Sequence, residues 1–557
     1  MIKKAFQTIS ILFEPSNILE AEKEKWKYIF GVLLLFGCGI RLYYGLQNIV
    51  DIQYADEAAY MRFGLNLFGE MRRDWGPMYA VWYKCLSFVT TDTIELYYIN
   101  YVITSVLVGV LLYVYLLRIS VHSAFALLIA FSILVSDLNV SVWPRISHFC
   151  IVLCLIVLII ITYLKNTTYK FLLFTTMCLV VAYARPEFYL SFVLSFFATI
   201  CCIYYNRKTF TKKDIPVFLL TIIAIILLHI IFRFPSNDFF GYNRSVAAFY
   251  QHYAWNYKWR TGSTIDAWLY WEDLAKQQFG DCNSMWCIIK SKPSIFISNT
   301  LFNIKNYFVS IFANSFSYIF PLGIFHGRKL KLLLTVIIAI TFIALLSRKT
   351  TRIYFKKQII EFRFYLLLSF IFCAPTFISC MLIFPRDHYL YLQMLFLLLI
   401  LISVFGVLFE SISLKPIVFI VFGSLLLLAT PNIDKYKFLK TNTSSDVLCN
   451  KKLVTHLEKN YSDKPHVIFT NLPFINGILP TNFKEINTVF GKKKEIPFTH
   501  YLDSAQIDIV ILIPSILRDP HIKSDSTWLN FLNNYEQYNF KKDNFNACET
   551  TVLIKQK

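Results

Sequence analysis

The stretch Tyr97–Leu117, YYINYVITSVLVGVLLYVYLL, decides the fold class of this 557-residue chain. It carries no charged side chain, and about 20 consecutive apolar residues form a helix that crosses the ~30 Å hydrocarbon core of a bilayer. Other blocks along the chain have the same character. The sequence therefore predicts about eleven transmembrane helices, at residues 28–46, 97–117, 122–140, 146–164, 169–184, 187–205, 215–234, 330–347, 364–384, 389–408 and 414–430.

The composition excludes several classes of protein. Hydrophobic residues make up 56% of the chain and charged residues 16%, whereas soluble domains are typically about a quarter charged. This balance excludes a disordered protein and argues against a soluble enzyme. The net charge of +20 does not indicate a nucleic-acid partner, because Lys and Arg lie mostly in short loops between apolar blocks. We predict a polytopic α-helical membrane protein.

The basic residues also set the predicted orientation. With the N-terminus in the cytoplasm, the Lys/Arg-rich stretches 165–170, 207–213 and 348–363 all fall inside. The apolar block 307–325 is then predicted to be a re-entrant or interfacial helix, because a twelfth crossing would place 348–363 outside. Three larger segments face the outer compartment: residues 47–96, 235–329 and 431–557.

The composition changes after residue 430. Short β-like runs alternate there with helix-like segments, which predicts a small α/β accessory lobe, 431–557, behind a transmembrane domain of residues 1–430. The predicted strands are Val467–Thr470, Ile507–Ile513 and Thr551–Ile554, and the predicted helices span 446–459 and 526–538. The tail shows no glycine-rich phosphate loop and no His/Cys set with metal-ligand spacing.

Five cysteines lie in the outward-facing segments: Cys85, Cys282, Cys287, Cys449 and Cys548. Cys282 with Cys287, and Cys449 with Cys548, are candidate disulfides if the outer compartment is oxidising. The alternative, in which all five are reduced, stays open from the sequence.

The first outer segment contains the most informative stretch, Asp51–Lys84. Asp56 and Glu57 open a helix-like segment just after the first span. One interpretation is structural, because acidic side chains at a helix N-terminus are favoured by the helix dipole. The other is functional, with a carboxylate held at the membrane surface as a general base.

Basic and aromatic side chains follow in the same segment. Arg62, Arg72 and Arg73 suit a reaction with an anionic leaving group, because the guanidinium fork pairs with phosphate through two parallel hydrogen bonds. The alternative is an ordinary loop that contacts lipid headgroups, in which Trp75 belongs to an interfacial aromatic belt.

Three charged turns lie at predicted outer ends of spans: Trp143–His148 (WPRISH), Ala184–Glu187 (ARPE) and Phe384–Tyr389 (FPRDHY). Arg145, Arg185, Arg386 and His388 are candidate phosphate ligands, and Glu187 is a candidate substrate contact. The alternatives are an internal salt bridge of Arg185 with Glu187 and snorkelling of Arg386 to the headgroups.

The order of these residues resembles the GT-C superfamily of membrane glycosyltransferases, in the bacterial branch related to protein mannosyltransferases and aminoarabinose transferases. The matching positions are Asp56–Glu57, Tyr60, Asp74–Trp75 and Pro77–Tyr79. The resemblance covers the membrane part of the chain, up to about residue 430, while the tail is similar only in type.

The resemblance implies a sugar transfer from a polyprenyl-phosphate donor to a hydroxyl of a cell-envelope glycan, lipid or protein, with inversion. Asp56 would be the base, Glu57 would orient it, and the arginines would hold the leaving phosphate. Tyr60, Arg72, Arg73, Asp74, Trp75 and Glu187 would contact substrate, and segment 235–329 would form part of the acceptor site.

Some members of the superfamily need a divalent metal, but no dedicated ligand set is visible, so we predict no tightly bound metal. The expected location is the bacterial inner membrane, with the site facing the periplasm.

Two other classes of function compete with this interpretation. A transporter or flippase of lipid-linked sugars often shows inverted repeats and broken helices near the membrane midplane, and we find no repeat in this sequence. A non-catalytic scaffold of envelope assembly would tolerate loss of Asp56 and Glu57, whereas an enzyme would not.

Overall fold

The computed structural model describes residues 25–69, 76–205, 212, 214–234, 238–239, 242–315, 328–410, 415–436, 439, 448–488, 496–519 and 522–556. Within these residues, six helices are long and apolar enough to cross a membrane: Lys25–Asn48, Thr93–Arg118, Ile146–Tyr163, Pro186–Tyr205, Ile215–Phe232 and Lys349–Leu382. Five shorter apolar helices accompany them, at Ser123–Leu134, Thr167–Ala182, Val336–Ser347, Met394–Leu408 and Pro416–Ala429. The chain therefore has the helices of a membrane protein.

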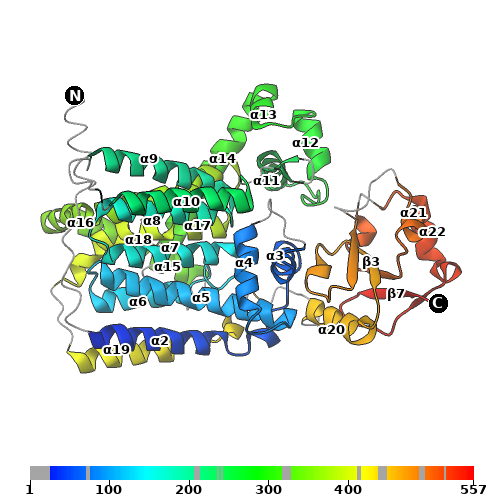
Figure 1. Ribbon diagram of the computed structural model, residues 1–557, viewed down its shortest axis with the longest axis horizontal. Helices are drawn as coiled ribbons and strands as arrows, with labels where there is room; N and C mark the ends of the chain where they lie inside the picture. Colours follow the sequence, from blue (N-terminus) through cyan, green and yellow to red (C-terminus); the bar gives the residue numbers. More distant parts are fainter. Residues whose placement is uncertain are drawn as a thin grey trace.

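A helix lies in every predicted apolar segment. The helices are α2 (Lys25–Tyr43), α5 (Thr93–Arg118), α6 (Ser123–Leu134), α7 (Ile146–Tyr163), α8 (Thr167–Ala182), α9 (Tyr189–Tyr205), α10 (Ile215–Phe232), α15 (Arg328–Ser347), α16 (Lys349–Leu382), α17 (Asp387–Leu392) with α18 (Met394–Phe405), and α19 (Pro416–Ala429). Most of them run side by side in one bundle (Figure 1). The number of crossings stays a prediction, since only six helices meet the criterion of length and composition.

The bundle is built on close helix contacts inside and apolar side chains outside. A side chain at Gly39 of α2 would come within 2.6 Å of Val106 of α5, so only glycine allows these helices to approach so closely. On α10, Leu220 and Ile230 remain 65% and 67% exposed. A surface of this apolar character is suited to lipid rather than water.

One predicted span is helical over only part of its length. The block 122–140 is helical as far as Leu134, and the chain then turns irregularly toward Arg145. The buried Asn139 holds this turn, since its Nδ2 donates to the Leu134 carbonyl at 3.0 Å and its Oδ1 accepts from Tyr391 Oη at 2.5 Å. Irregular backbone is tolerated inside a helical bundle where protein groups satisfy its hydrogen bonds.

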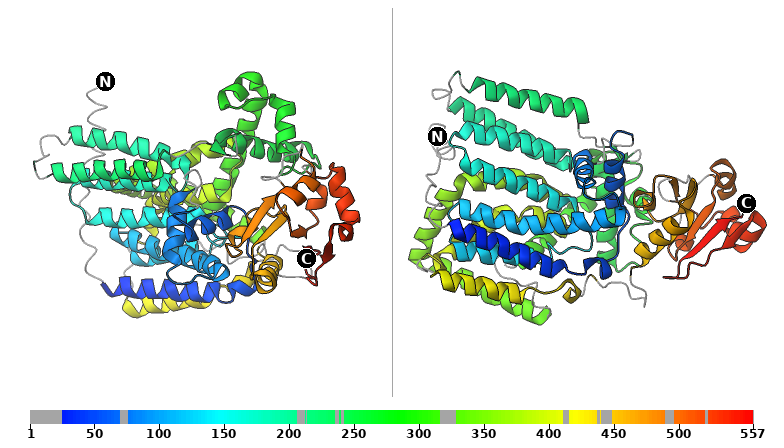
Figure 2. Two further views of the ribbon diagram at one scale, coloured as in Figure 1. Left: turned by 45° about the vertical axis from the view of Figure 1, so that its right-hand side comes forward. Right: turned by 60° about the horizontal axis from the view of Figure 1, so that its bottom comes forward.

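The outer segments gather at one end of the bundle (Figures 1 and 2). The first contributes α3 (Asp56–Leu65) and α4 (Pro77–Leu86), and the second contributes β1 (Asp238–Phe239), β2 (Tyr242–Asn243), α11 (Arg244–Thr261), α12 (Trp271–Phe279), α13 (Met285–Ser291) and α14 (Pro293–Ser315). Cys282 and Cys287 form a disulfide between α12 and α13. The predicted re-entrant block 307–325 is helical in α14 up to Ser315, and residues 316–327 lie outside the described residues.

The tail forms the predicted small lobe around a five-stranded sheet of order β4-β3-β5-β7-β6. The strands are β3 (His466–Thr470), β4 (Phe483–Asn487), β5 (Ile509–Leu512), β6 (Phe540–Lys542) and β7 (Thr551–Lys555), flanked by α20 (Cys449–Tyr461), α21 (Phe498–Ser504) and α22 (Ser526–Asn533). β3 pairs in parallel with β4 and β5, whereas β7 runs antiparallel to β5 and β6. The sequence predicted β3, β5 and β7 but not β4 and β6, and the predicted helix 526–538 ends at Asn533.

The two faces of this sheet belong to different cores. Ile468, Ile509 and Val552 join the core that continues into the transmembrane helices. Phe469 and Val510, which alternate with them along the strands, pack in a second core with α21 and α22. The lobe is therefore packed onto the membrane part through one apolar face.

The orientation of the bundle can be tested by labelling. We expect a membrane-impermeant maleimide to modify Cys85, a free and exposed thiol on α4, in spheroplasts of an expression host. A phosphatase fused after Thr430 should be active, and one fused after Lys165 should be inactive. Cys85→Ser is the labelling control. An active fusion at Lys165 with an inactive one at Thr430 would reverse the predicted orientation.

Candidate active site

Asp56 and Glu57 stand at the start of α3, where the backbone is unusual. The preceding Ala55 has φ 64° and ψ −140°, a positive-φ conformation outside the left-handed helical region that is rare for a residue with a side chain. Its N–H donates to the carbonyl of Pro473 in the lobe at 2.8 Å. Strained backbone of this kind persists where surrounding structure holds it, often at functional sites.

Glu57 is buried and fully engaged. Its Oε1 accepts hydrogen bonds from Tyr79 Oη at 2.7 Å, from Asn100 Nδ2 at 3.0 Å and from Tyr83 Oη. Burial raises the pKa of Glu57 to about 8, although the two tyrosine hydroxyls oppose the shift. Glu57 thus anchors α3 to α4 and α5 from the inner side.

Asp56 has the opposite environment. Its side chain is exposed, and its carboxylate makes no hydrogen bond or ion pair with any residue in the described part of the chain. The nearby protein desolvates it enough to raise its pKa, while Arg244, Arg386 and Arg185 act in the other direction. The charges of three arginines from three separate elements therefore act on one solvent-accessible carboxylate.

Arg185 and Arg145 are each held by specific neighbours. Arg185 is paired with Glu187, with its Nε and Nη2 each 2.6 Å from Glu187 Oε1, and it lies 4.9 Å above the ring of Tyr389. Arg145 Nη1 lies 3.0 Å from His388 Nδ1. These contacts fix the planes of both guanidiniums before any ligand is present.

The charges in this cluster act on one another. Burial, reinforced by the charge of Arg386, lowers the pKa of Arg145 to about 10. Burial and the surrounding arginines also hold the pKa of His388 well below its usual range. His388 is therefore neutral, and since its Nδ1 accepts from Arg145, its Nε2 carries the proton and is the available donor.

Arg386 differs from its neighbours because it has no partner in the part of the chain that the structure describes. Its guanidinium makes no hydrogen bond or ion pair with the residues that the structure describes. Burial lowers its pKa, while the Asp56 carboxylate acts to raise it. A partly buried guanidinium with unused donors is a ready site for an oxyanion.

Two residues of the cluster were missed by the sequence analysis. Arg244 begins α11 and acts on Asp56. His252 is buried farther along the same helix, with its ring 4.3 Å from that of Phe384. Nothing local in segment 235–329 marks either residue, because only the packing of α11 against the 384–389 turn brings them to the site.

The remaining predicted residues have other surroundings. The charge of Arg62 acts to lower the pKa of Glu485 in the lobe. Tyr60 is buried with its ring 5.2 Å from Tyr79. Arg72, Arg73, Asp74 and Trp75 lie outside the described residues. Among the described residues, no group of three or more His, Cys, Asp or Glu side chains is placed to hold a metal ion.

The lobe reaches α3 directly. A Cβ added to Gly477, in the 3-10 turn Ile475–Gly477, would lie 2.2 Å from the carbonyl oxygen of Ala58. No side chain fits there, so the backbone of the lobe touches the backbone of α3 within one turn of Asp56. Together with the Ala55–Pro473 hydrogen bond, this contact fixes the start of α3 from the outer side.

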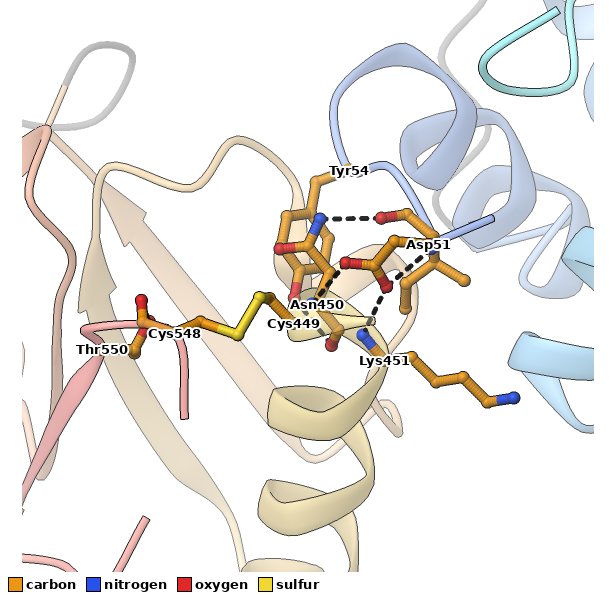
Figure 3. The surroundings of a disulfide bond; sticks show 8 residues. Asp51, Tyr54, Cys449, Asn450, Lys451, Cys548 and Thr550 are labelled. Atoms are coloured by element: carbon orange, nitrogen blue, oxygen red, sulfur yellow. Dashed lines mark hydrogen bonds between the residues drawn. A yellow bond between two sulfur atoms is a disulfide. The ribbon is translucent and has the colours of Figure 1, made fainter. Parts of the chain in front are cut away.

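A second connection joins the lobe to the segment that precedes α3. The Asp51 carboxylate accepts from the backbone N–H groups of Asn450 at 2.8 Å and Lys451 at 3.0 Å, and so caps α20 (Figure 3). Cys449, at the first position of α20, is bonded to Cys548 near β7. Both candidate disulfides of the sequence are thus formed in the structure.

Comparison with known proteins adds no family to this description. No protein-family model matches the sequence, and no curated protein is significantly similar to it. The chemistry of the site must therefore be argued from its own residues.

We expect Gly477→Ala to disturb α3, because a methyl group would displace the Ala58 backbone. Overpacking of this kind typically costs about 1–3 kcal/mol, so the melting temperature of the purified protein should fall. Gly37→Ala is the control, since a Cβ there would meet only Leu427 at 3.7 Å. Unchanged melting of the Gly477 variant would show that the lobe does not constrain α3.

Proposed function

We propose that the chain is an integral membrane glycosyltransferase that moves a sugar from a polyprenyl-phosphate donor to a hydroxyl of a cell-envelope glycan, lipid or protein. The observation that carries the proposal is the exposed Asp56 carboxylate, which has no hydrogen-bond or ion-pair partner among the described residues and lies in the field of Arg185, Arg244 and Arg386. This arrangement supports a base and a phosphate site close together, where a membrane-bound donor would present its headgroup.

In the proposed reaction Asp56 takes the proton of the acceptor hydroxyl. The acceptor oxygen attacks the anomeric carbon, the bond from that carbon to the phosphate oxygen breaks, and polyprenyl phosphate leaves from the opposite face with inversion. The raised pKa of Asp56 supports this role, because a carboxylate of higher pKa is a stronger base. Its solvent exposure leaves it accessible to an acceptor.

The arginines would neutralise the charge that develops on the leaving phosphate. Arg185 and Arg145 are already oriented by Glu187 and His388, so little reorganisation accompanies the reaction. The guanidinium N–H groups of Arg386 have no acceptor among the described residues, and the neutral His388 adds an Nε2–H donor. Positioning and preorganised charge are the main sources of rate in this scheme.

Glu57 would act as a positioning residue. It is adjacent to Asp56 in sequence but buried, with three donors on one oxygen, so it holds the helix that carries the base. We therefore assign proton removal to Asp56 alone.

The base is tested by Asp56→Asn, which keeps the shape and removes the basicity. Loss of a positioned general base typically lowers the rate about 10²–10⁴-fold, while donor binding should persist. Mass spectrometry of co-purifying lipids would identify the donor, and transfer of its labelled sugar would be the assay. Glu57→Gln should lower the rate of sugar transfer less than Asp56→Asn does, because a Gln oxygen can accept the same hydrogen bonds.

The matched control is Asp92→Asn. Asp92 also stands at a helix start, but its carboxylate caps α5 by accepting from Glu95 N–H at 2.8 Å, and Asn caps about as well as Asp. Wild-type turnover by Asp56→Asn would remove Asp56 as the base. Wild-type turnover by the Asp56/Glu57 double variant would end the assignment of the chemistry to this pair of acids.

The phosphate site is tested by Arg386→Gln and Arg386→Lys. A charge-assisted hydrogen bond contributes about 1.5–3 kcal/mol, so the donor KM should rise about 10–100-fold. Lys should restore only part of the affinity, because it lacks the planar fork. Arg348→Gln, in the basic inner segment, is the control. An unchanged donor KM for both Arg386 variants would contradict the assignment.

A further inference from the structure

A second recognition surface lies on the outer helices, apart from Asp56. An open groove of about 400 Å³ is formed where α11, α12 and the start of α14 meet. Its volume falls in the range of about 300–1,000 Å³ that is usual for small-molecule sites. The helices that form the walls pack around a small apolar core of their own. The adjacent Cys282–Cys287 disulfide restrains the connection from α12 to α13.

The lining of the groove combines aromatic rings with neutral hydrogen-bonding groups. Tyr253 and Tyr257 present rings from α11, and Gln278 comes from α12. Ser294 and Ser298 contribute hydroxyls from the first turns of α14. Arg260 bridges two walls, since its Nη1 donates to Ser298 Oγ at 3.3 Å and its guanidinium lies 5.8 Å from the Tyr253 ring.

This combination fits a saccharide better than other ligands. Sugars present apolar C–H faces, which pack on aromatic rings, and a rim of hydroxyls, which amide, guanidinium and hydroxyl groups can bind. A phosphate site would collect several cations, but Arg260 is the only cation among the groove residues. A lipid-chain site would be mostly aliphatic, yet Ile295 is the only aliphatic lining residue.

The groove is connected to the candidate active site through a single helix. α11 begins at Arg244, which acts on Asp56, and passes His252, which is buried within the field of Arg386. At 1.5 Å per residue, Arg260 lies about 12 Å beyond His252 along the helix axis. The candidate active site and the groove therefore lie along one helix, at a separation that an extended glycan rather than a single sugar would span.

We propose that this groove binds the saccharide chain of the acceptor, a few units away from the hydroxyl that receives the new sugar. The acceptor is then an extended glycan rather than a protein side chain or a single lipid headgroup. The identification of the bound saccharide as the acceptor rests on the proposed function, whereas saccharide binding itself does not.

The experiment uses the full-length protein in detergent on a glycan array, with Gln278→Ala, Tyr257→Ala and Tyr257→Phe. A set of related oligosaccharides should bind to the wild type. Each Ala variant should bind them about five- to tenfold more weakly, the effect of one lost hydrogen bond or ring contact. Tyr257→Phe keeps the aromatic ring, so its affinity for the oligosaccharides should fall less than that of Tyr257→Ala.

Gln277→Ala is the matched control, because Gln277 is the exposed neighbour of Gln278 on α12 and does not line the groove. Asp56→Asn should bind the same glycans as the wild type, which separates this inference from the proposed chemistry. Array binding without sugar transfer would reject the proposed function and leave the groove assignment intact. Absence of glycan binding, equal binding by the Ala variants, or groove-dependent binding of phosphatidylglycerol vesicles instead would overturn the groove assignment.

Discussion

The backbone contact between Gly477 and Ala58 is the constraint on which the candidate site depends. It joins a turn of the C-terminal lobe to the first turn of α3, at a distance that excludes any side chain. The Ala55–Pro473 hydrogen bond and the capping of α20 by Asp51 hold the same two segments together. The lobe therefore shares a core with the bundle and holds the helix that carries Asp56.

That constraint separates two adjacent acids into different environments. Glu57 lies inside the protein with three hydrogen-bond donors, while Asp56 is left exposed among arginines. Pairs of titratable groups in contrasting environments are a recurring means of assigning different roles to similar side chains. Here the buried acid supports the helix, and the exposed acid has no hydrogen-bond partner among the described residues.

The arginines of the cluster repel one another, and neighbouring side chains offset this repulsion. Glu187, Asp387 and aromatic rings offset the repulsion among Arg145, Arg185 and Arg386. Buried cations are costly unless they are paired or hydrogen-bonded. The incomplete pairing at Arg386 is thus the feature of the cluster that most directly invites an anionic ligand.

The sequence by itself determined the positions of the apolar helices, the strands β3, β5 and β7, and the acidic start of α3. These features follow from local composition and periodicity, which a linear chain displays directly. Only the tertiary structure decided that the charge of Arg244 acts on Asp56, that the charge of Arg62 acts on Glu485, and that each outer cysteine other than Cys85 is paired. It also revealed β4 and β6, the two edge strands of the sheet, whose sequence pattern is weak. The reason is physical: proximity between residues far apart in the chain is set by how helices and strands pack, and no local spacing encodes it.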